Sequence, residues 1–310
     1  FYNWRAKKRA EYLLNTTNKK GVLSRIPESF KDREICLAAV KRDKAALLCV
    51  PKHIMDVEIS IAAVRKHGTS VMWVKKDILN YEICLEAAKQ DGRALPYIPD
   101  EFKTTELCIE AVKSDSHSII FVRLKNDEFY GRQTFYDGNF THNTEKSSIL
   151  NAEICSAVIA KNGFCLMYIP VRFRTRELCY TAVCSYGFAL SHVPSDIIDY
   201  EMCMTAIESC AMVFHDVPEK FRDYDLCFKA VSNCGLNLQH VEADIINREM
   251  CLAAVKSFGT TLQYVPEKFR DVEVCVEAVK KHRDAVSHIP TGIKREVYTI
   301  LGFNTDYLRL

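Results

Sequence analysis

The sequence predicts an all-α solenoid of about ten 24-residue repeats, each made of two helices. Three observations predict it: a Glu-x-Cys motif recurs in one register, the apolar residues around it follow a helical period, and helix start and stop signals recur with them. The motif's acid, called position zero below, recurs in steps of 24 residues with one break, at Glu34, Glu58, Glu82, Glu106, Glu153, Glu177, Glu201, Asp225, Glu249 and Glu273.

The first segment of each repeat is predicted to be a helix of about ten residues. Aliphatic residues at position one, Cys at two, Ala at five and usually Val at six cover more than half of a helix's circumference, which indicates packing between two neighbours. An Asp or Asn two residues before the acid, such as Asp32 or Asp271, is a good N-cap. The acid then lies in the first turn, where the helix dipole favours a negative charge, and Lys or Arg often follows at position seven.

The second segment is predicted to be a shorter helix. Gly at position ten, as in Gly68 and Gly259, is expected to close the first helix as its C-cap. Apolar residues at thirteen and sixteen fit a helix better than a strand, and Pro at seventeen, as in Pro51 and Pro266, must end it. One such unit buries too little apolar surface to offset the entropy of ordering its own chain, so the repeats must stack.

A leucine-rich repeat is the alternative architecture, because its period is similar and Leu-x-x-Val-Pro-x-x-Phe resembles part of one. The strand signature Leu-x-x-Leu-x-Leu-x-x-Asn is absent, however, and no Asn ladder replaces it. We therefore prefer the helical solenoid.

The single break lies between Glu106 and Glu153, a step of 47 residues, one short of two repeats. It indicates that one unit has been replaced. The segment 126–150 carries Asp137-Gly138 between two short aromatic runs, which predicts a projecting hairpin or ordered loop. Its aromatic residues are Phe129, Tyr130, Phe135, Tyr136 and Phe140.

The repeats divide the chain into five parts. We expect an N-terminal capping helix in 1–25, repeats one to four in 26–125, the replaced repeat in 126–150, repeats five to ten in 151–292, and a C-terminal cap and tail in 293–310. Atypical ends of this kind are usual in stacked arrays.

Composition places the chain among globular proteins, with 48% apolar and 26% charged residues in 310. The 42 basic and 40 acidic residues nearly balance, which argues against a polyanion bound along the whole length. Without a long apolar run or a signal peptide, we expect no membrane span and an intracellular location. Most of the fourteen cysteines share one helical position, so we expect buried free thiols in a reducing compartment. Because the chain begins with Phe1, an organelle-targeting segment ahead of it stays an open alternative.

The repeat pattern Asp-x-Glu-x-Cys-Leu-x-Ala-Val-Lys-x-x-Gly-x-x-Leu-x-x-Val-Pro-x-x-Phe resembles the helical family catalogued as domain of unknown function 4116. The resemblance covers about residues 26–300 apart from the replaced unit. Cys at position two departs from the aliphatic residue that is more usual there. The resemblance implies a scaffold and no particular activity.

No motif predicts an enzyme, a cofactor or a small-molecule substrate. The sequence lacks Cys-x-x-Cys, a Gly-x-x-x-x-Gly-Lys phosphate loop, a Gly-x-Ser-x-Gly elbow and His-Glu-x-x-His. Catalytic carboxylates need contrasting environments, whereas the ten acids share one by symmetry. Cysteines one repeat apart are separated by roughly 10 Å, too far to converge on a metal ion. We therefore expect no catalytic residue, cofactor or metal.

The most informative column is position fifteen, where aromatic residues and His predominate. Its rings either stack on one another between repeats or form an exposed ladder, with Leu48, Met72, Ile120 and Met167 at position fourteen making its first half apolar. We predict a scaffold that binds a protein partner, and one form of this prediction is a structural subunit of a larger assembly. Single-stranded RNA is the alternative partner. The candidate partner-binding residues are Trp73, Tyr97, Phe121 and Tyr168 together with the five aromatics of the replaced repeat.

Overall fold

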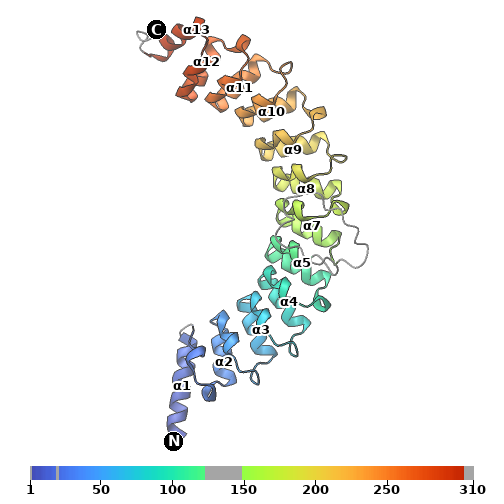
Figure 1. The fold of residues 1–310 in the computed structure, drawn as a ribbon, viewed down its shortest axis with the longest axis vertical. Coiled ribbons are helices and arrows are strands. Elements are labelled where there is room, and N and C mark those ends of the chain that lie inside the picture. Colours follow the sequence, from blue (N-terminus) through green and yellow to red (C-terminus); the bar gives the residue numbers. More distant parts are fainter. Residues whose placement is uncertain (1, 19–20, 123–148, 304–310) are drawn as a thin grey trace. The chain divides into compact units, whose positions relative to one another are not determined.

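The computed structural model describes residues 2–18, 21–122 and 149–303, and every regular element in these ranges is a helix. The chain divides into two compact units, unit 1 ending at Phe173 and unit 2 beginning at Arg174. Within each unit the long helices lie side by side in chain order, with shorter helices between them (Figure 1). The fold is therefore the predicted all-α solenoid.

The described part of unit 1 contains six long helices: α1 (Tyr2–Asn18), α2 (Arg33–Val40), α3 (Val57–Lys66), α4 (Tyr81–Gln90), α5 (Thr105–Ser114) and α7 (Ala152–Lys161). The short elements are the one-turn helix α6 (Ile119–Val122) and the 3-10 helices η1 (Leu23–Arg25), η2 (Glu28–Phe30), η3 (Lys44–Cys49), η4 (Gly68–Trp73), η5 (Gly92–Tyr97), η6 (Asp100–Phe102), η7 (Ser116–Ser118), η8 (Gly163–Tyr168) and η9 (Val171–Phe173).

Unit 2 contains α8 (Arg176–Ser185), α9 (Tyr200–Ser209), α10 (Tyr224–Asn233), α11 (Arg248–Ser257), α12 (Val272–Lys281) and α13 (Thr291–Leu301). Its 3-10 helices are η10 (Gly187–His192), η11 (Ala211–Asp216), η12 (Glu219–Phe221), η13 (Gly235–His240), η14 (Gly259–Tyr264), η15 (Glu267–Phe269) and η16 (Arg283–His288).

The long helices α2 to α5 and α7 to α12 begin where the caps predict. In each, the side chain two residues before the acid accepts a hydrogen bond from the backbone N–H three residues further on, as Asp271 does from Val274 at 3.0 Å. Nine of these ten helices are ten residues long, as predicted, and α2 has eight.

The cysteines at position two lie in the core. All nine have no exposed surface, and all fourteen cysteines of the chain are free thiols. Burial raises the pKa of each of these nine thiols from 9.0 to about 11 or 12. Ser60 takes the place of the tenth Cys, and its hydroxyl donates to the Asp56 carbonyl at 2.8 Å. The position therefore selects small side chains that need no external partner.

The predicted role of the Gly at position ten is wrong. In the repeat of α11, for example, the long helix ends at Ser257, the next residue Phe258 has extended backbone (φ −147°), and Gly259 begins the 3-10 helix η14. Among the described residues only Gly21 and Gly302 have positive φ. A Cβ on Gly259 would lie 2.3 Å from the Ala278 carbonyl oxygen of the following helix. Gly is thus needed because the backbones of neighbouring repeats approach closely here.

The acids at position zero also link neighbouring repeats. Arg248, just before one acid, donates to both Asp271 and Glu273 of the next repeat at 2.5 Å. Burial alone would raise the pKa of Asp271, but the Arg248 guanidinium and the Val274 N–H together hold it below its ordinary value. Residues in the same register that bridge in this way are Arg9, Arg33, Tyr81, Arg176, Tyr200 and Tyr224.

The connecting segments that the structure describes are of two kinds, a distinction absent from the predicted 24-residue unit. One kind contains Phe in a short 3-10 helix and ends in a basic residue, and the other contains Ile in a turn and ends in an aliphatic residue. In unit 2 they alternate before α9, α10, α11 and α12, so its structural unit is a pair of repeats. The basic residues are Lys31, Lys103, Arg174, Arg222 and Arg270.

Arg270 shows what the basic residue does. Its Nε donates to the Val265 carbonyl at 2.7 Å, Nη2 to Gln263 at 3.1 Å and Nη1 to His288 at 3.3 Å. It thereby joins the C-terminal ends of η14 and η16, where helical carbonyls have no partner of their own. The equivalent Lys31 makes a single bond of this kind, to the Cys49 carbonyl at 3.0 Å.

We expect Arg270→Ala to lower the free energy of unfolding by about 2 to 3 kcal/mol, because three carbonyls lose a charged donor. Arg270→Lys should lower it by about half as much, since an ammonium lacks the fork geometry of the guanidinium. Urea unfolding followed by circular dichroism measures both. Arg295→Ala, on an exposed position of α13, is the matched control and should change stability by less than about 0.5 kcal/mol. If Arg270→Ala lowered the free energy of unfolding as little as the control does, the proposed stabilisation of η14 and η16 by Arg270 would be contradicted.

Candidate partner-binding face

One row of exposed apolar side chains runs along the short helices of unit 1. Leu48, Met72 and Tyr97 are 59%, 47% and 45% exposed, and they lie on η3, η4 and η5. These three helices contact one another in chain order. We call the row of Leu48, Met72 and Tyr97 the short-helix face. Leu48 and Met72 are at position fourteen and Tyr97 is at fifteen, because Pro96 occupies fourteen in its repeat. Ile120 on α6 and Met167 on η8, at position fourteen of the later repeats, are half-buried.

The geometry of a 3-10 helix explains the exposure. With three residues per turn, positions thirteen and sixteen lie above one another, and both face the core, as buried Leu47 and Val50 do. Position twelve, which lies above fifteen, is also buried, as in Ala46 and Ser70, so position fourteen is on the one side of the helix that points outward. The buried pair is evident in the sequence, so the exposed position is in principle predictable, although the sequence prediction selected position fifteen instead.

Position fourteen changes character in unit 2. There it is occupied by Ser191, His215, Gln239, Gln263 and Ser287, and all five are exposed. The repeats therefore fold equally well with a polar residue at this position. Stacking does not require the apolar side chains of unit 1.

The rings at position fifteen do not form a continuous ladder. Tyr97 is exposed, whereas Trp73, Phe121 and Tyr168 are half-buried. Among the ring contacts that join described residues, none pairs two members of this column. Tyr168 instead meets Phe164 at 6.1 Å and His117 at 6.5 Å, and burial raises the pKa of its hydroxyl.

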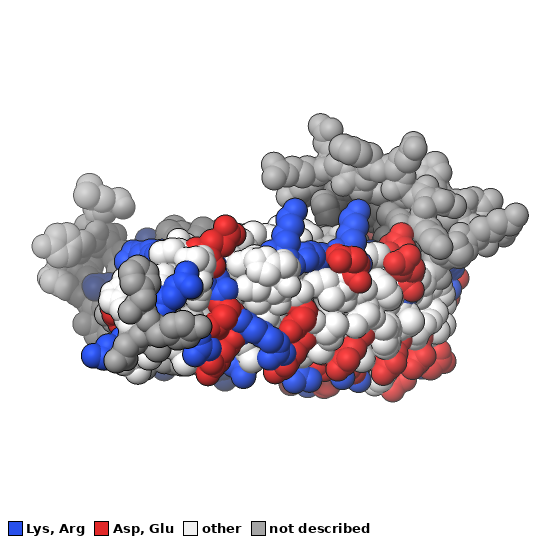
Figure 2. Space-filling view, turned by 90° about the horizontal axis from the view of Figure 1, so that it is seen from below, with Lys and Arg blue, Asp and Glu red and all other residues white. Residues whose placement is uncertain are grey.

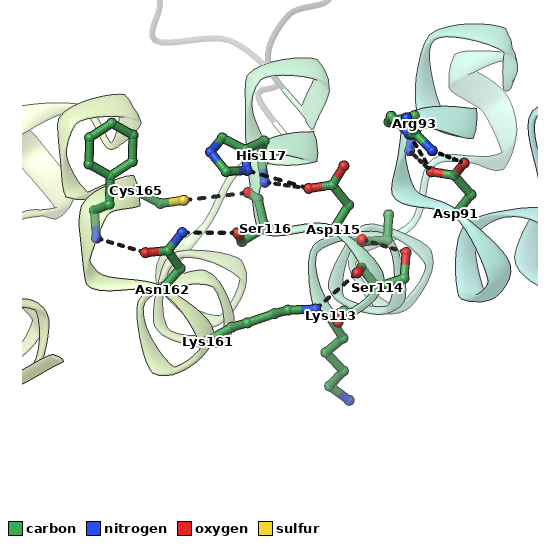
Figure 3. Close-up of polar contacts among 12 residues, drawn as sticks. Asp91, Arg93, Lys113, Ser114, Asp115, Ser116, His117, Lys161, Asn162 and Cys165 are labelled. Atoms are coloured by element: carbon green, nitrogen blue, oxygen red, sulfur yellow. Dashed lines mark hydrogen bonds and ion pairs between the residues drawn. The ribbon is translucent and has the colours of Figure 1, made fainter. Parts of the chain in front are cut away.

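His117 belongs to the junction at which the repeat spacing breaks. Lys161 on α7 donates to the Ser114 carbonyl at 2.9 Å, Asn162 donates to Ser116 Oγ at 3.4 Å, and Cys165 Sγ lies 3.7 Å from the Ser116 carbonyl (Figure 3). Helix α7 thus packs directly on α5, although 46 to 49 residues separate these partners. The stack continues across the break without a gap for another repeat.

The predicted hairpin or loop in 126–150, with Phe129, Tyr130, Phe135, Tyr136 and Phe140, lies outside the described residues except for its last two positions. The two described ends flanking this stretch are Val122 at the end of α6 and Ile149. Val122 is at position sixteen of its repeat, two residues after Ile120 at position fourteen.

Charged side chains are mixed on the surface. On the side shown in Figure 2, acidic and basic residues lie next to one another among uncharged ones. In unit 1 several of them pair, for example Arg65 with Glu86 at 2.6 Å and Lys113 with Glu110 at 2.9 Å.

Two kinds of feature are absent from the described residues. No cluster of three or more His, Cys, Asp or Glu there is arranged to hold a metal ion. No helix among them is long and apolar enough to cross a membrane.

Comparison with known proteins identifies a family for the repeats. The family model described as Domain of unknown function (DUF4116) matches residues 56–103, 151–198, 199–245 and 247–294, together more than half of the chain. Each match covers two long helices, which agrees with the pairing of repeats by their two kinds of connecting segment. No curated protein and no solved structure matches the chain.

Proposed function

The chain belongs to the family described as Domain of unknown function (DUF4116), and from this premise we propose that it is a non-enzymatic helical-repeat scaffold that binds a protein partner through the short-helix face of unit 1. Such a scaffold can serve as a structural subunit of a larger assembly. The ten buried free cysteines favour a reducing intracellular compartment for it.

One observation carries the proposal, the repeated exposure of Leu48, Met72 and Tyr97 in three successive repeats. Leaving a large apolar side chain in water forgoes about 1.5 to 3 kcal/mol of burial free energy. The polar residues at position fourteen of unit 2 indicate that the repeat does not need this exposure. A contiguous apolar row with no role in folding is typical of a protein interaction surface.

A protein partner is favoured over single-stranded RNA. Base stacking needs open ring faces beside a positively charged groove. Trp73, Phe121 and Tyr168 are half-buried, and the basic residues Arg65 and Lys113 are paired with acids. These features make the nucleic-acid alternative the weaker one.

Affinity purification under reducing conditions tests the proposal. We expect a stoichiometric protein to co-purify with the wild-type chain and to be lost, by about tenfold or more, from the double variant Leu48→Gln/Met72→Gln. The matched control is Gln239→Ala/Gln263→Ala, which changes the same position of the repeat in unit 2 and should keep the partner.

The outcomes separate the two kinds of partner. Co-purification that resists ribonuclease and fails only with the unit 1 variant supports a protein partner. Retention of the protein by both variants contradicts the short-helix face. Loss on ribonuclease treatment, with a salt-sensitive gel shift, would favour RNA.

A further inference from the structure

A second row of exposed apolar side chains lies on unit 2, at a different position of the repeat. Met212 is 63% and Phe258 46% exposed, and Tyr186 is also exposed. These residues occupy positions nine and eleven, at the turn from each long helix into its 3-10 helix. We call the following residues at these positions the turn row: the exposed Tyr186, Met212, Phe258 and His282 together with the half-buried Phe188, Cys210, Cys234 and Leu236.

The members of the turn row reach one another. Tyr186 and Phe188, at positions nine and eleven of one repeat, have ring centroids 5.7 Å apart. Phe258 and His282, at position nine of successive repeats, have ring centroids 6.5 Å apart. Ring contacts thus occur within one repeat at the N-terminal end of the row and between two successive repeats at its C-terminal end.

Unit 1 uses the same position differently. There Asp43, Asp91, Asp115 and Asn162 at position nine each accept a hydrogen bond from the backbone N–H two residues on, at 3.0 to 3.1 Å, and His67 before η4 is the exception. This bond caps the following 3-10 helix, where N–H groups otherwise lack partners. In unit 2 the residue at position nine caps none of the five corresponding helices, η10, η11, η13, η14 and η16, although the N–H groups of Gly187 and Gly235 donate to Ser209 Oγ and Ser257 Oγ of the next repeat.

Unit 2 thus lacks the capping hydrogen bond made by position nine in unit 1, and it has exposed apolar side chains at positions nine and eleven. Neither feature favours folding, because the cap satisfies a backbone donor and the side chains of Met212 and Phe258 are exposed to water. A binding role accounts for both features together, since a ligand that covers the row would bury these side chains.

The charges beside the row indicate the partner's chemistry. Lys256, Lys281 and Arg283 are exposed near its C-terminal members Phe258 and His282. Asp284 is the acid in the turn that follows, 3.7 Å from His282 Nδ1. Basic side chains therefore outnumber acidic ones at this end, and an acidic ligand is the complementary one.

The lack of a sheet edge on the described surface of unit 2 favours a helical ligand. Unit 2 has no strand among its described residues, so no sheet edge is available to pair with an extended peptide. A helix satisfies its own backbone, and its residues at i and i+7 are about 10.5 Å apart, close to the 8 to 10 Å between packed helices. One apolar residue per heptad would thus meet one member of the row per repeat.

We propose that the turn row of unit 2 is a docking surface for an acidic amphipathic helix of a partner protein. It is independent of the short-helix face of unit 1, so either surface can exist without the other.

The probe is a fluorescent, helix-forming peptide of about 14 residues, long enough to extend over two repeat steps, with Leu and Phe on one face and Glu elsewhere. Fluorescence anisotropy with the full chain should show binding of the acidic peptide, weakening as salt is raised. A peptide with the same apolar face and Lys in place of Glu should bind at least about tenfold more weakly, and so should the acidic peptide with a central Pro, which breaks the helix.

Three double variants test whether the peptide binds to the turn row. Met212→Gln/Phe258→Thr should weaken acidic-peptide binding by about tenfold or more, whereas Leu48→Gln/Met72→Gln in unit 1 should leave it unchanged. Lys256→Glu/Lys281→Glu should weaken the acidic peptide and strengthen the basic one. All six of these side chains are exposed, so the variants should retain the fold, which circular dichroism verifies.

The proposal is overturned if the acidic peptide fails to bind, if the basic or Pro-containing peptide binds as tightly, or if the Met212/Phe258 variant binds like the wild type. Loss of binding in the unit 1 variant alone would assign the peptide to the short-helix face and also overturn the proposal. Failure here leaves the partner co-purified through unit 1 unaffected, so the two proposals are tested separately.

Discussion

Raising the pH above about 9 is expected to unfold unit 1 in reducing buffer. Cys36 and Cys108 have pKa values of about 11, and Cys84 and Cys155 of about 12, because burial disfavours the thiolate. The unfolded chain releases these protons near the ordinary value of 9.0, whereas the folded unit retains them. Stability is therefore full below pH 9 and is lost as the pH rises toward 11.

The effect is large because the thiols act together. Each one lowers the free energy of unfolding by about 1.4 kcal/mol per pH unit in this window, and four lower it by about 5 kcal/mol per pH unit. A domain's whole stability is about 5 to 15 kcal/mol. Both tryptophans, Trp4 and Trp73, lie in unit 1, so their fluorescence during urea unfolding at several pH values reports this unit.

The double variant Cys84→Ala/Cys155→Ala is the control for this pH dependence. It removes two of these four position-two thiols, so the part of the loss of stability per pH unit that the four cause should fall by roughly half; Cys165, whose pKa burial also raises, stays in both proteins. A stability that stays flat between about pH 9 and 10, or a slope that the substitutions leave unchanged, would show that the buried thiols do not govern alkaline unfolding.

Gly259→Val is expected to lower the free energy of unfolding of unit 2 by about 3 kcal/mol. A Cβ at this position would lie 2.3 Å from the Ala278 carbonyl oxygen and 2.7 Å from the His282 nitrogen, both backbone atoms. Neither atom can move without shifting α12 away from its neighbour. The added side chain must therefore separate two repeats or strain the backbone.

Gly292→Val is the matched control, because a Cβ there meets no atom within 4 Å. The same substitution in α13 should change stability by less than about 0.5 kcal/mol, since Val and Gly differ little in helix propensity. Urea unfolding followed by circular dichroism compares the two. Equal effects at both glycines would mean that backbone flexibility, and not the close approach of repeats, explains the recurring Gly at position ten.

Much of the fold follows from local sequence. The N-caps, the ten-residue helices and the buried Cys column were predicted because each depends on residues within one turn or one helical period. The role of Gly259 was not, because it depends on a carbonyl 19 residues away on another helix. The bridge from Arg248 to Asp271 and Glu273 was missed for the same reason.

The candidate site was predicted less well than the fold. The sequence predicts a row of rings at position fifteen. The structure places Tyr97 exposed but Trp73 and Tyr168 half-buried, and the other exposed members lie one position earlier, at Leu48 and Met72. Distinguishing them requires both the three-residue turn of the 3-10 helix and the burial of position twelve, which lies above position fifteen. The sequence also shows that unit 2 has no Asp or Asn at position nine. That these residues cap the 3-10 helices is evident only from the hydrogen bonds of unit 1.

The direct packing of α7 on α5 has a thermodynamic consequence for the length of the chain between them. In a loop-closure description, the entropy lost in joining two contact points grows only with the logarithm of the separation. Going from the usual step of 24 residues to one of 47 therefore adds about 0.6 kcal/mol, less than a single helix cap contributes. Residues can therefore be added or exchanged between α5 and α7 at little cost in stability, while these two helices stay in contact.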